Sequence, residues 1–193
     1  MKAASKKRMS RAIKPSKLQP IILLTALFVG AIVGCKACSD HYENNGAVIQ
    51  VCFSPEGNCT KFAEAAIAKA QNTILVQAYA FTSVPIAEAL LAAHQRGVEV
   101  KILVDRSQLK SKSSQARHVM KQGIAVAVDN VPGIAHNKVM IIDDQYVLTG
   151  SFNWSEAAET RNAENLLLID DFKTNSIYKE EWEYRAEQAQ AFE

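Results

Sequence analysis

The sequence predicts an α/β domain in which a mixed, largely parallel sheet is sandwiched between helices. From residue 47 onward, short β-rich runs alternate with helical segments, an order typical of strands joined by crossover helices. Two later runs are separated only by Asp143, Asp144 and Gln145, which indicates a hairpin and therefore a mixed sheet. The 193 residues contain no internal repeat or low-complexity segment and suffice for one well-buried domain.

The first half of this domain is predicted to contain three strands and two helices. The strands are Ala47–Phe53, Ile74–Phe81 and Val98–Asp105. The first strand ends at the turn signal Ser54-Pro55-Glu56-Gly57. Thr60 can cap the first helix, whose apolar residues recur at helical spacing. The second helix spans Val84–Arg96, with Ser83 as its cap, a proline in its first turn and a glycine at its end.

The second half is predicted to contain two further helices and four further strands. The helices are Ser114–Lys121, which closes on Gly123, and Asp171–Gln188. The strands are Ile124–Val128, Ala135–Ile142, Tyr146–Thr149 and Asn165–Ile169. The middle two of these strands form the hairpin.

The first 34 residues are typical of an export signal. Residues 1–20 carry seven Lys and Arg and no acid, and the apolar run Ile21–Gly34 follows. A basic segment before an apolar stretch of about 7–15 residues indicates a secretory signal peptide. Because a bilayer-spanning helix needs about 20 apolar residues, an inner-membrane anchor over residues 18–34 is the alternative. We expect an exported protein, periplasmic or secreted, with a linker at residues 35–46 and a domain at residues 47–193.

Without this leader the chain is acidic. The leader holds seven of the 22 basic residues, which leaves 15 against 20 acidic ones, or −5. The mild basicity of the whole chain therefore does not indicate a nucleic-acid surface. One basic stretch remains, which faces either a polyanion or only solvent: Lys101, Arg106, Lys110, Lys112, Arg117 and Lys121, opposed by Asp105.

All four cysteines lie in the first third of the chain. Because an exported protein permits a disulfide, Cys52 and Cys59 are expected to form one or to remain free thiols. The pair Cys35 and Cys38 lacks the second ligand pair that a structural metal site requires, so we predict no metal. The tetrapeptide Ile32–Cys35 resembles the cleavage box of bacterial lipoproteins, which would place a lipid on Cys35.

A histidine and a lysine stand two residues apart near the start of the predicted strand Ala135–Ile142. Side chains two apart in a strand share a face, so His136 and Lys138 point together. Val139 and Ile141 are expected to be buried on the other face. Such a pair suits a phosphate, because lysine holds a nonbridging oxygen by charge and histidine can attack phosphorus or move a proton.

Further polar groups follow the hairpin. Ser151 and Asn153 stand at the end of the next strand, where they can bind the same phosphate oxygens as charge builds in the transition state. Glu164 offers a carboxylate that can orient and stabilise the imidazole.

The spacing of these residues resembles the phospholipase D-like superfamily. Its signature is the pattern HxKxxxxD, here His136, Lys138 and Asp143, followed by GSxN, here Gly150–Asn153. The segments FSPEG and AAETRNAEN are similar to its small bacterial endonuclease branch, and the resemblance covers roughly residues 47–188. It implies a phospholipase D-like fold, in which a histidine attacks phosphorus to give a phosphohistidine and a second histidine protonates the leaving alcohol. Water then cleaves the intermediate, with no metal or cofactor.

The resemblance also assigns roles by position. It makes His136 the nucleophile or the acid, with Glu164 supporting it. Phosphate binding falls to Lys138 and Asn153, assisted by Ser151. Asp143 completes the catalytic signature, but its odd spacing from His136 places it off that face, so we expect it to pin the hairpin or pair with a neighbour.

Only one copy of the signature is present, whereas the larger members of the superfamily carry two. None of His41, His94 and His118 is followed two residues on by lysine. Because the chemistry needs two histidines, the resemblance implies a homodimer in which each chain gives one His136 to a cleft on the two-fold axis.

Three functions remain open. The favoured one is an exported, metal-independent, non-specific endonuclease acting on DNA or RNA, because the short connections leave little protein for a lipid-binding lid. The alternative is a phospholipase D acting on membrane phospholipids, which the N-terminal apolar segment would bring to the bilayer. The third is a non-catalytic, polyanion-binding adaptor, against which the intact set of site residues argues.

Overall fold

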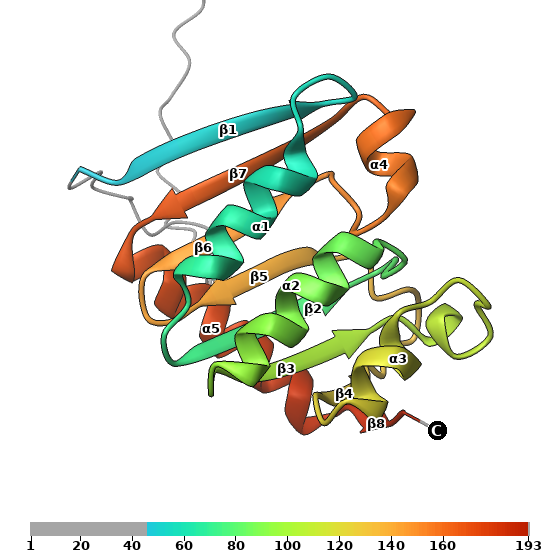
Figure 1. The fold of residues 1–193 in the computed structure, drawn as a ribbon. Coiled ribbons are helices and arrows are strands. Elements are labelled where there is room, and N and C mark those ends of the chain that lie inside the picture. The colour runs from blue at the N-terminus through green and yellow to red at the C-terminus, as the bar shows by residue number, and fades with distance from the viewer. Residues whose placement is uncertain (1–45, 193) are drawn as a thin grey trace, which may run out of the picture. The chain divides into compact units, whose positions relative to one another are not determined.

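The computed structural model describes residues 46–192, where one mixed sheet carries helices on both faces (Figure 1). The predicted leader, most of the linker, and with them Cys35, Cys38 and His41, lie outside the described residues. Within the described part of the chain, no helix has the length and apolarity needed to cross a membrane.

The sheet of the described range has eight strands in the order β1-β7-β6-β5-β2-β3-β4-β8. Their bounds are β1 Val48–Ser54, β2 Thr73–Ala78, β3 Glu99–Val104, β4 Ala125–Val128, β5 Lys138–Ile142, β6 Tyr146–Gly150, β7 Glu164–Asp170 and β8 Gln190–Ala191. Two neighbouring pairs in this range, β2–β3 and β3–β4, are parallel and the other five are antiparallel.

The prediction of a mixed α/β sheet is therefore confirmed, but "largely parallel" overstates the parallel part. Parallel neighbours need a crossover connection. In the described part of the chain, crossover helices join neighbouring strands only between β2 and β3 and between β3 and β4. The strands β5 and β6 form the predicted hairpin, and β1, β7 and β8 each lie beside a strand of opposite direction.

Helices cover both faces of this sheet, as a sandwich requires (Figure 1). Their bounds are α1 Cys59–Lys69, α2 Val84–Gln95, α3 Ala116–Lys121, α4 Glu156–Thr160 and α5 Phe172–Glu187, with a 3-10 turn, η1, at Arg106–Leu109. The helices α1, α2 and α3 lie on one face and α5 on the other. The sequence did not indicate α4, η1 or β8.

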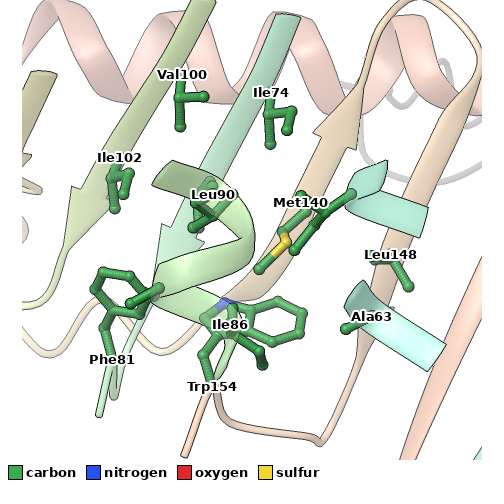
Figure 2. Packing of buried hydrophobic residues seen from close by; sticks show 14 of the residues in the cluster. Ala63, Ile74, Phe81, Ile86, Leu90, Val100, Ile102, Met140, Leu148 and Trp154 are labelled. Atoms are coloured by element: carbon green, nitrogen blue, oxygen red, sulfur yellow. The ribbon is translucent and has the colours of Figure 1, made fainter. Parts of the chain in front are cut away.

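The alternation of side chains along the strands divides the core into two clusters. On β2, Ile74 lies in the same cluster as Leu90 of α2 (Figure 2). Val76 belongs to this cluster too. The intervening Leu75 points to the other face, where it packs with Trp182 of α5. The indole Nε1 of Trp182 also donates to the carbonyl of Val76 at 3.0 Å. This packing covers the central strands on both faces.

The observed element boundaries correct two local expectations. Thr60 does not cap α1, because the helix begins at Cys59 with Asn58 as its N-cap residue. The strand predicted to start at Ala135 begins at Lys138, so His136 lies in the loop before β5. Ser83 does cap α2 and accepts a hydrogen bond from the Ile86 amide.

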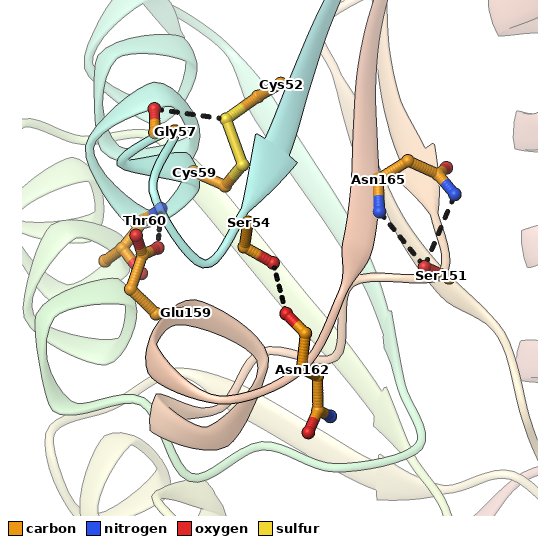
Figure 3. Close-up of a disulfide and its surroundings, with 9 residues drawn as sticks. All are labelled: Cys52, Ser54, Gly57, Cys59, Thr60, Ser151, Glu159, Asn162 and Asn165. Atoms are coloured by element: carbon orange, nitrogen blue, oxygen red, sulfur yellow. Dashed lines mark hydrogen bonds between the residues drawn. A yellow bond between two sulfur atoms is a disulfide. The ribbon is translucent and has the colours of Figure 1, made fainter.

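Cys52 and Cys59 form a disulfide, which decides between the two alternatives left open for them (Figure 3). The bond joins β1 to the first residue of α1. Beside it, the hydroxyl of Ser54 donates to the carbonyl of Asn162 at 3.2 Å. These contacts attach the edge strand β1 to the rest of the fold next to the start of β7.

Candidate active site

A pocket of about 520 Å³ lies at the sheet edge where β2 ends and β5 begins. Strands β5, β6 and β7 and helix α5 all contribute to its wall. It brings together five of the six predicted site residues: His136, Lys138, Ser151, Asn153 and Glu164. The sixth, Asp143, is not among its lining residues.

The side chains of His136, which is exposed, and Lys138, which is buried, meet in the wall of this pocket. The Nζ atom of Lys138 lies 2.9 Å from Nδ1 of His136 and donates to the His136 carbonyl at 2.6 Å. The ring of Tyr79 lies 4.4 Å from the imidazole, measured between centroids. Because an ammonium can only donate, Nδ1 accepts and the proton of the neutral imidazole is on Nε2. In this arrangement Nε2 carries the proton, so attack on phosphorus by Nε2 requires the other tautomer.

Lys138 is only 5% exposed. Burial lowers the pKa of Lys138, and the negative charge of Glu164 acts in the opposite direction. A poorly hydrated cation beside an open pocket is suited to bind a phosphate oxygen, because little water must be displaced from it.

Ser151 and Glu164 hold each other on the opposite wall. The hydroxyl of Ser151 donates to Glu164 Oε2 at 2.5 Å. It accepts from the Asn165 amide at 3.1 Å (Figure 3). Asn162 donates to the other Glu164 oxygen at 2.9 Å. Between residues 46 and 192, no hydrogen bond joins Glu164 to His136. The support of His136 by Glu164 that the resemblance implies is therefore not made within this part of one chain.

The close packing around residue 150, directly before Ser151, explains why this residue is glycine. A Cβ atom at this position would lie 2.3 Å from the carbonyl oxygen of Asn165. That carbonyl accepts hydrogen bonds from the amides of Ser151 and Phe152, at 3.1 and 3.2 Å. The close approach of the two strands thus requires glycine and places Ser151 at the pocket.

Within residues 46–192, two buried polar atoms of the pocket have no hydrogen-bond partner. They are Oδ1 of Asn153 and Nε2 of Gln77, and both residues line the pocket. Buried polar groups are nearly always paired, so unpaired ones at a pocket are available to a substrate. Gln77 was not predicted. Its signal was a polar residue inside the apolar run Ile74–Phe81.

Asp143 lies away from this pocket and serves the fold. Its carboxylate accepts from the backbone amides of Gln71, Asn72 and Thr73, at 3.0, 2.8 and 2.9 Å. It therefore ties the hairpin to the connection between α1 and β2. Its inclusion among the catalytic residues is not supported by its position, whereas the expected structural role matches these contacts.

Exchange of Asp143 for asparagine is expected to lower the free energy of unfolding by about 1–3 kcal/mol, because an amide accepts these hydrogen bonds less well than a carboxylate. Asparagine tolerates the left-handed conformation of this residue, whose φ is 52°. Turnover of a phosphodiester should change by less than about threefold, since the residue is outside the site. Urea unfolding at fixed protein concentration measures the first effect, with Asp144→Asn as control. Lost turnover at unchanged stability would show that Asp143 is catalytic.

Among residues 46–192, no group of three or more His, Cys, Asp or Glu side chains is arranged to hold a metal ion.

The chain is similar to a family model, to several named proteins and to solved structures. A family model described as cardiolipin synthase, PLD-like domain, matches residues 64–185. A protein of Rickettsia conorii named phospholipase D is 46% identical over 145 residues, which are 74% of this chain and 72% of the relative. A protein of Xenopus tropicalis named mitochondrial cardiolipin hydrolase is 34% identical over 115 residues, or 60% of this chain and 55% of the relative. The crystal structure of a phospholipase D family member, Nuc from Salmonella typhimurium, superposes with a TM-score of 0.72 at 38% identity. That superposition covers 76% of this chain and 98% of Nuc.

Proposed function

The chain belongs to the phospholipase D-like superfamily of phosphodiesterases, and from this premise we propose that it is an exported, metal-independent endonuclease. In this proposal His136 forms a phosphohistidine intermediate, and two copies of the chain share one active site.

The reaction then has two steps. In the first, Nε2 of one His136 forms a bond to phosphorus while the bond from phosphorus to the leaving oxygen breaks. The leaving oxygen takes a proton from Nε2 of the partner's His136, which enters this step as an imidazolium and leaves it as a neutral imidazole. In the second, water attacks phosphorus, loses a proton to that second imidazole and frees the first. The ammonium of Lys138, with the amide of Asn153, holds the nonbridging oxygens throughout.

The observation that favours a nucleic acid as substrate is a set of exposed basic side chains. They lie at the end of the sheet where the pocket is found. Arg106, Lys110 and Lys112 follow directly on the end of β3. The guanidinium of Arg106 donates to the carbonyl of Val131, in the loop that leads to His136. Lys101 does not belong to this set, because it lies within β3 and pairs with Glu99 at 2.8 Å. Repeated phosphates of a nucleic acid can contact such a basic edge while one phosphodiester occupies the pocket.

A comparison of substrates tests this choice. The purified chain is incubated with supercoiled plasmid, single-stranded RNA, phosphatidylcholine vesicles, cardiolipin vesicles and an aryl phosphodiester, each with and without chelator. We expect cleavage of plasmid or RNA and of the aryl phosphodiester, and intact vesicles. Activity that disappears with chelator on every substrate would contradict the metal-free mechanism.

A phospholipase D is the second candidate, and one observation favours it. The edge strand β1 exposes Ile49, Val51 and Phe53 on one face, and Phe53 is 66% exposed. Such an apolar strip can contact lipid, and the relatives from Rickettsia and Xenopus have names that refer to lipid hydrolysis. Hydrolysis of either vesicle without cleavage of nucleic acid would establish this candidate in place of the first.

We assign the same strip to a second copy of the chain. The pocket holds one histidine, whereas the proposed reaction needs one imidazole to attack and another to protonate the leaving group. The strip adjoins the pocket, because Phe53 pairs across the sheet with Asn165, next to Glu164. Helix α5 packs over β2, β5 and β6 and does not cover the part of the sheet face where β1 exposes this strip. A two-fold related copy seated there closes the pocket and supplies its second histidine.

Exchange of Phe53 for lysine is expected to convert the dimer to a monomer and to lower turnover at least about tenfold, because a charge is buried in the contact. Sedimentation velocity and an aryl phosphodiester assay on the same sample measure both effects. Phe172→Lys is the matched control, since Phe172 is also exposed but follows the opposite end of β7. An active wild-type monomer would contradict the shared site.

A further inference from the structure

The loop that carries His136 is fixed on both sides of that residue. Before it, the amide of Ala135 donates to Asp105 Oδ2 at 2.8 Å. After it, the carbonyl of Asn137 accepts from the amide of Tyr79 at 3.1 Å. Asp105 follows the end of β3 and Tyr79 follows the end of β2, so two neighbouring parallel strands hold the loop.

Asp105 is 1% exposed and does not line the pocket. Its second oxygen, Oδ1, accepts from the amide of Ser107 at 2.8 Å and so begins the turn η1. Burial raises the pKa of Asp105, but hydrogen bonds from Ser107 and Ala135 and the charge of Arg106 outweigh it, so the pKa lies below its ordinary value. The side chain is therefore an ionised double acceptor, a role that asparagine cannot fill because its amide nitrogen only donates.

The same turn also holds the end of β2. Gln108 is buried in η1, where its Oε1 accepts from the amide of Phe81 at 3.2 Å. Its Nε2 donates to the carbonyl of Tyr79 at 3.1 Å. The ring of Tyr79 is the one that lies against the imidazole of His136. The segment Asp105–Gln108 thus contacts both the loop of His136 and the ring beside it.

We propose that Asp105 and Gln108 are positioning residues that set the orientation of His136 for attack and proton transfer. The proposal rests on the function proposed above, since it names what holds that function's nucleophile. Neither side chain touches the pocket, so each acts through the backbone of the residues that do. A displacement of the imidazole slows the chemical step but leaves the phosphate contacts of Lys138 and Asn153 in place.

The test compares Asp105→Asn with Asp129→Asn. Asp129 is a matched control, because it is also a buried aspartate directly after a parallel strand, β4, but its carboxylate binds Arg185 of α5 at 2.6 Å. Both variants are assayed on an aryl phosphodiester well below their unfolding temperatures. We expect kcat to fall about 10–100-fold in Asp105→Asn with KM changed less than about threefold, because misplacement by about 1 Å has effects of this size. In Asp129→Asn we expect only a lower unfolding temperature.

The second readout is the NMR signal of the imidazole Hε1 of His136, assigned by its loss in His136→Asn. It should shift or broaden in Asp105→Asn and stay unchanged in Asp129→Asn. If Asp105→Asn fails to fold, Gln108→Met replaces it in the test, because this exchange adds no charge. Gln108→Met should lower kcat and move the same signal. Equal effects of Asp105→Asn and Asp129→Asn on kcat, or an unmoved signal in the former, would overturn the proposal. An inactive wild type would instead refute the proposed function, and the NMR comparison would still decide whether Asp105 positions His136.

Discussion

His136→Asn is expected to lower turnover of an aryl phosphodiester by about 10⁵-fold, the size of loss seen when a nucleophile is removed from a catalytic group that acts as a unit. Asparagine has no nitrogen lone pair that can attack phosphorus, and it cannot take or give the proton at this pH. The fold should persist, because within residues 46–192 the hydrogen-bond partner of the imidazole is Lys138, which is only two residues away in the chain. Turnover and thermal unfolding are measured on the same preparation.

His118→Asn is the matched control for this variant. His118 lies on the exposed face of α3, where its Nε2 is 3.0 Å from Glu88. Exposed pairs of this kind contribute little, so turnover should stay within about twofold of the wild type. Loss of activity in both variants would point to a general effect of removing histidine and not to the pocket.

Mixed dimers extend the test of His136 to the shared site. Chains with two different affinity tags, one wild type and one His136→Asn, are refolded together and the heterodimer is isolated through both tags. If one imidazole attacks and the other protonates, each dimer needs both. The heterodimer should then be as inactive as the homodimer of two His136→Asn chains. A heterodimer with half of the wild-type activity would mean that each chain has a complete site of its own.

Local patterns in the sequence account for most of the fold and for the members of the site. The apolar runs and their flanking turn residues predicted the seven long strands, because a short apolar run bounded by turn residues is a local property of the sequence. The strand partners were less predictable, since pairing depends on which distant segments meet. The two-residue β8, which pairs with β4, has too little pattern to be recognised. The expectation of a largely parallel sheet overstated the parallel part because the direction of each neighbour also depends on which distant segments pair.

The candidate site shows the same division. His136 and Lys138 were recognisable because they are two residues apart, and Ser151 and Asn153 because the hairpin brings its two ends together. The pairing of β2 with β5 and β3 brings Gln77 to the pocket and Asp105 to the loop of His136, and the sequence does not specify this pairing. Each has a local signal, a polar residue within or just after an apolar strand, but nothing local says which group it meets. Side-chain chemistry in a motif is thus readable, whereas its supports come from the topology.

Lys138→Met is expected to lower turnover by about 10³-fold, the loss typical of removing one strong donor to the transition state. It should at the same time raise the free energy of unfolding at neutral pH by about 1 kcal/mol, because active sites are often stabilised when a buried charge is removed. Methionine nearly matches the length of lysine and needs no hydration. The same side chain would then be required for activity and unfavourable for the fold.

The pH dependence of this difference follows from the sign of the shift. Burial lowers the pKa of Lys138 in the folded state below its ordinary value of 10.5, so the folded chain holds this proton less tightly than the unfolded one. The unfavourable effect is fully present below the folded pKa and disappears as pH rises through that pKa towards the unfolded value. The stability gained by Lys138→Met should therefore be largest near neutral pH and shrink in alkaline solution.

Lys179→Met is the control of opposite sign, because a hydrogen bond to Asp144 raises the pKa of Lys179. That variant should be less stable than the wild type at neutral pH, and its deficit should fade as pH rises. Urea unfolding of the three proteins at neutral and alkaline pH measures both effects, and a loss of stability in Lys138→Met near pH 7 would refute the assignment of Lys138 as an unfavourably buried charge.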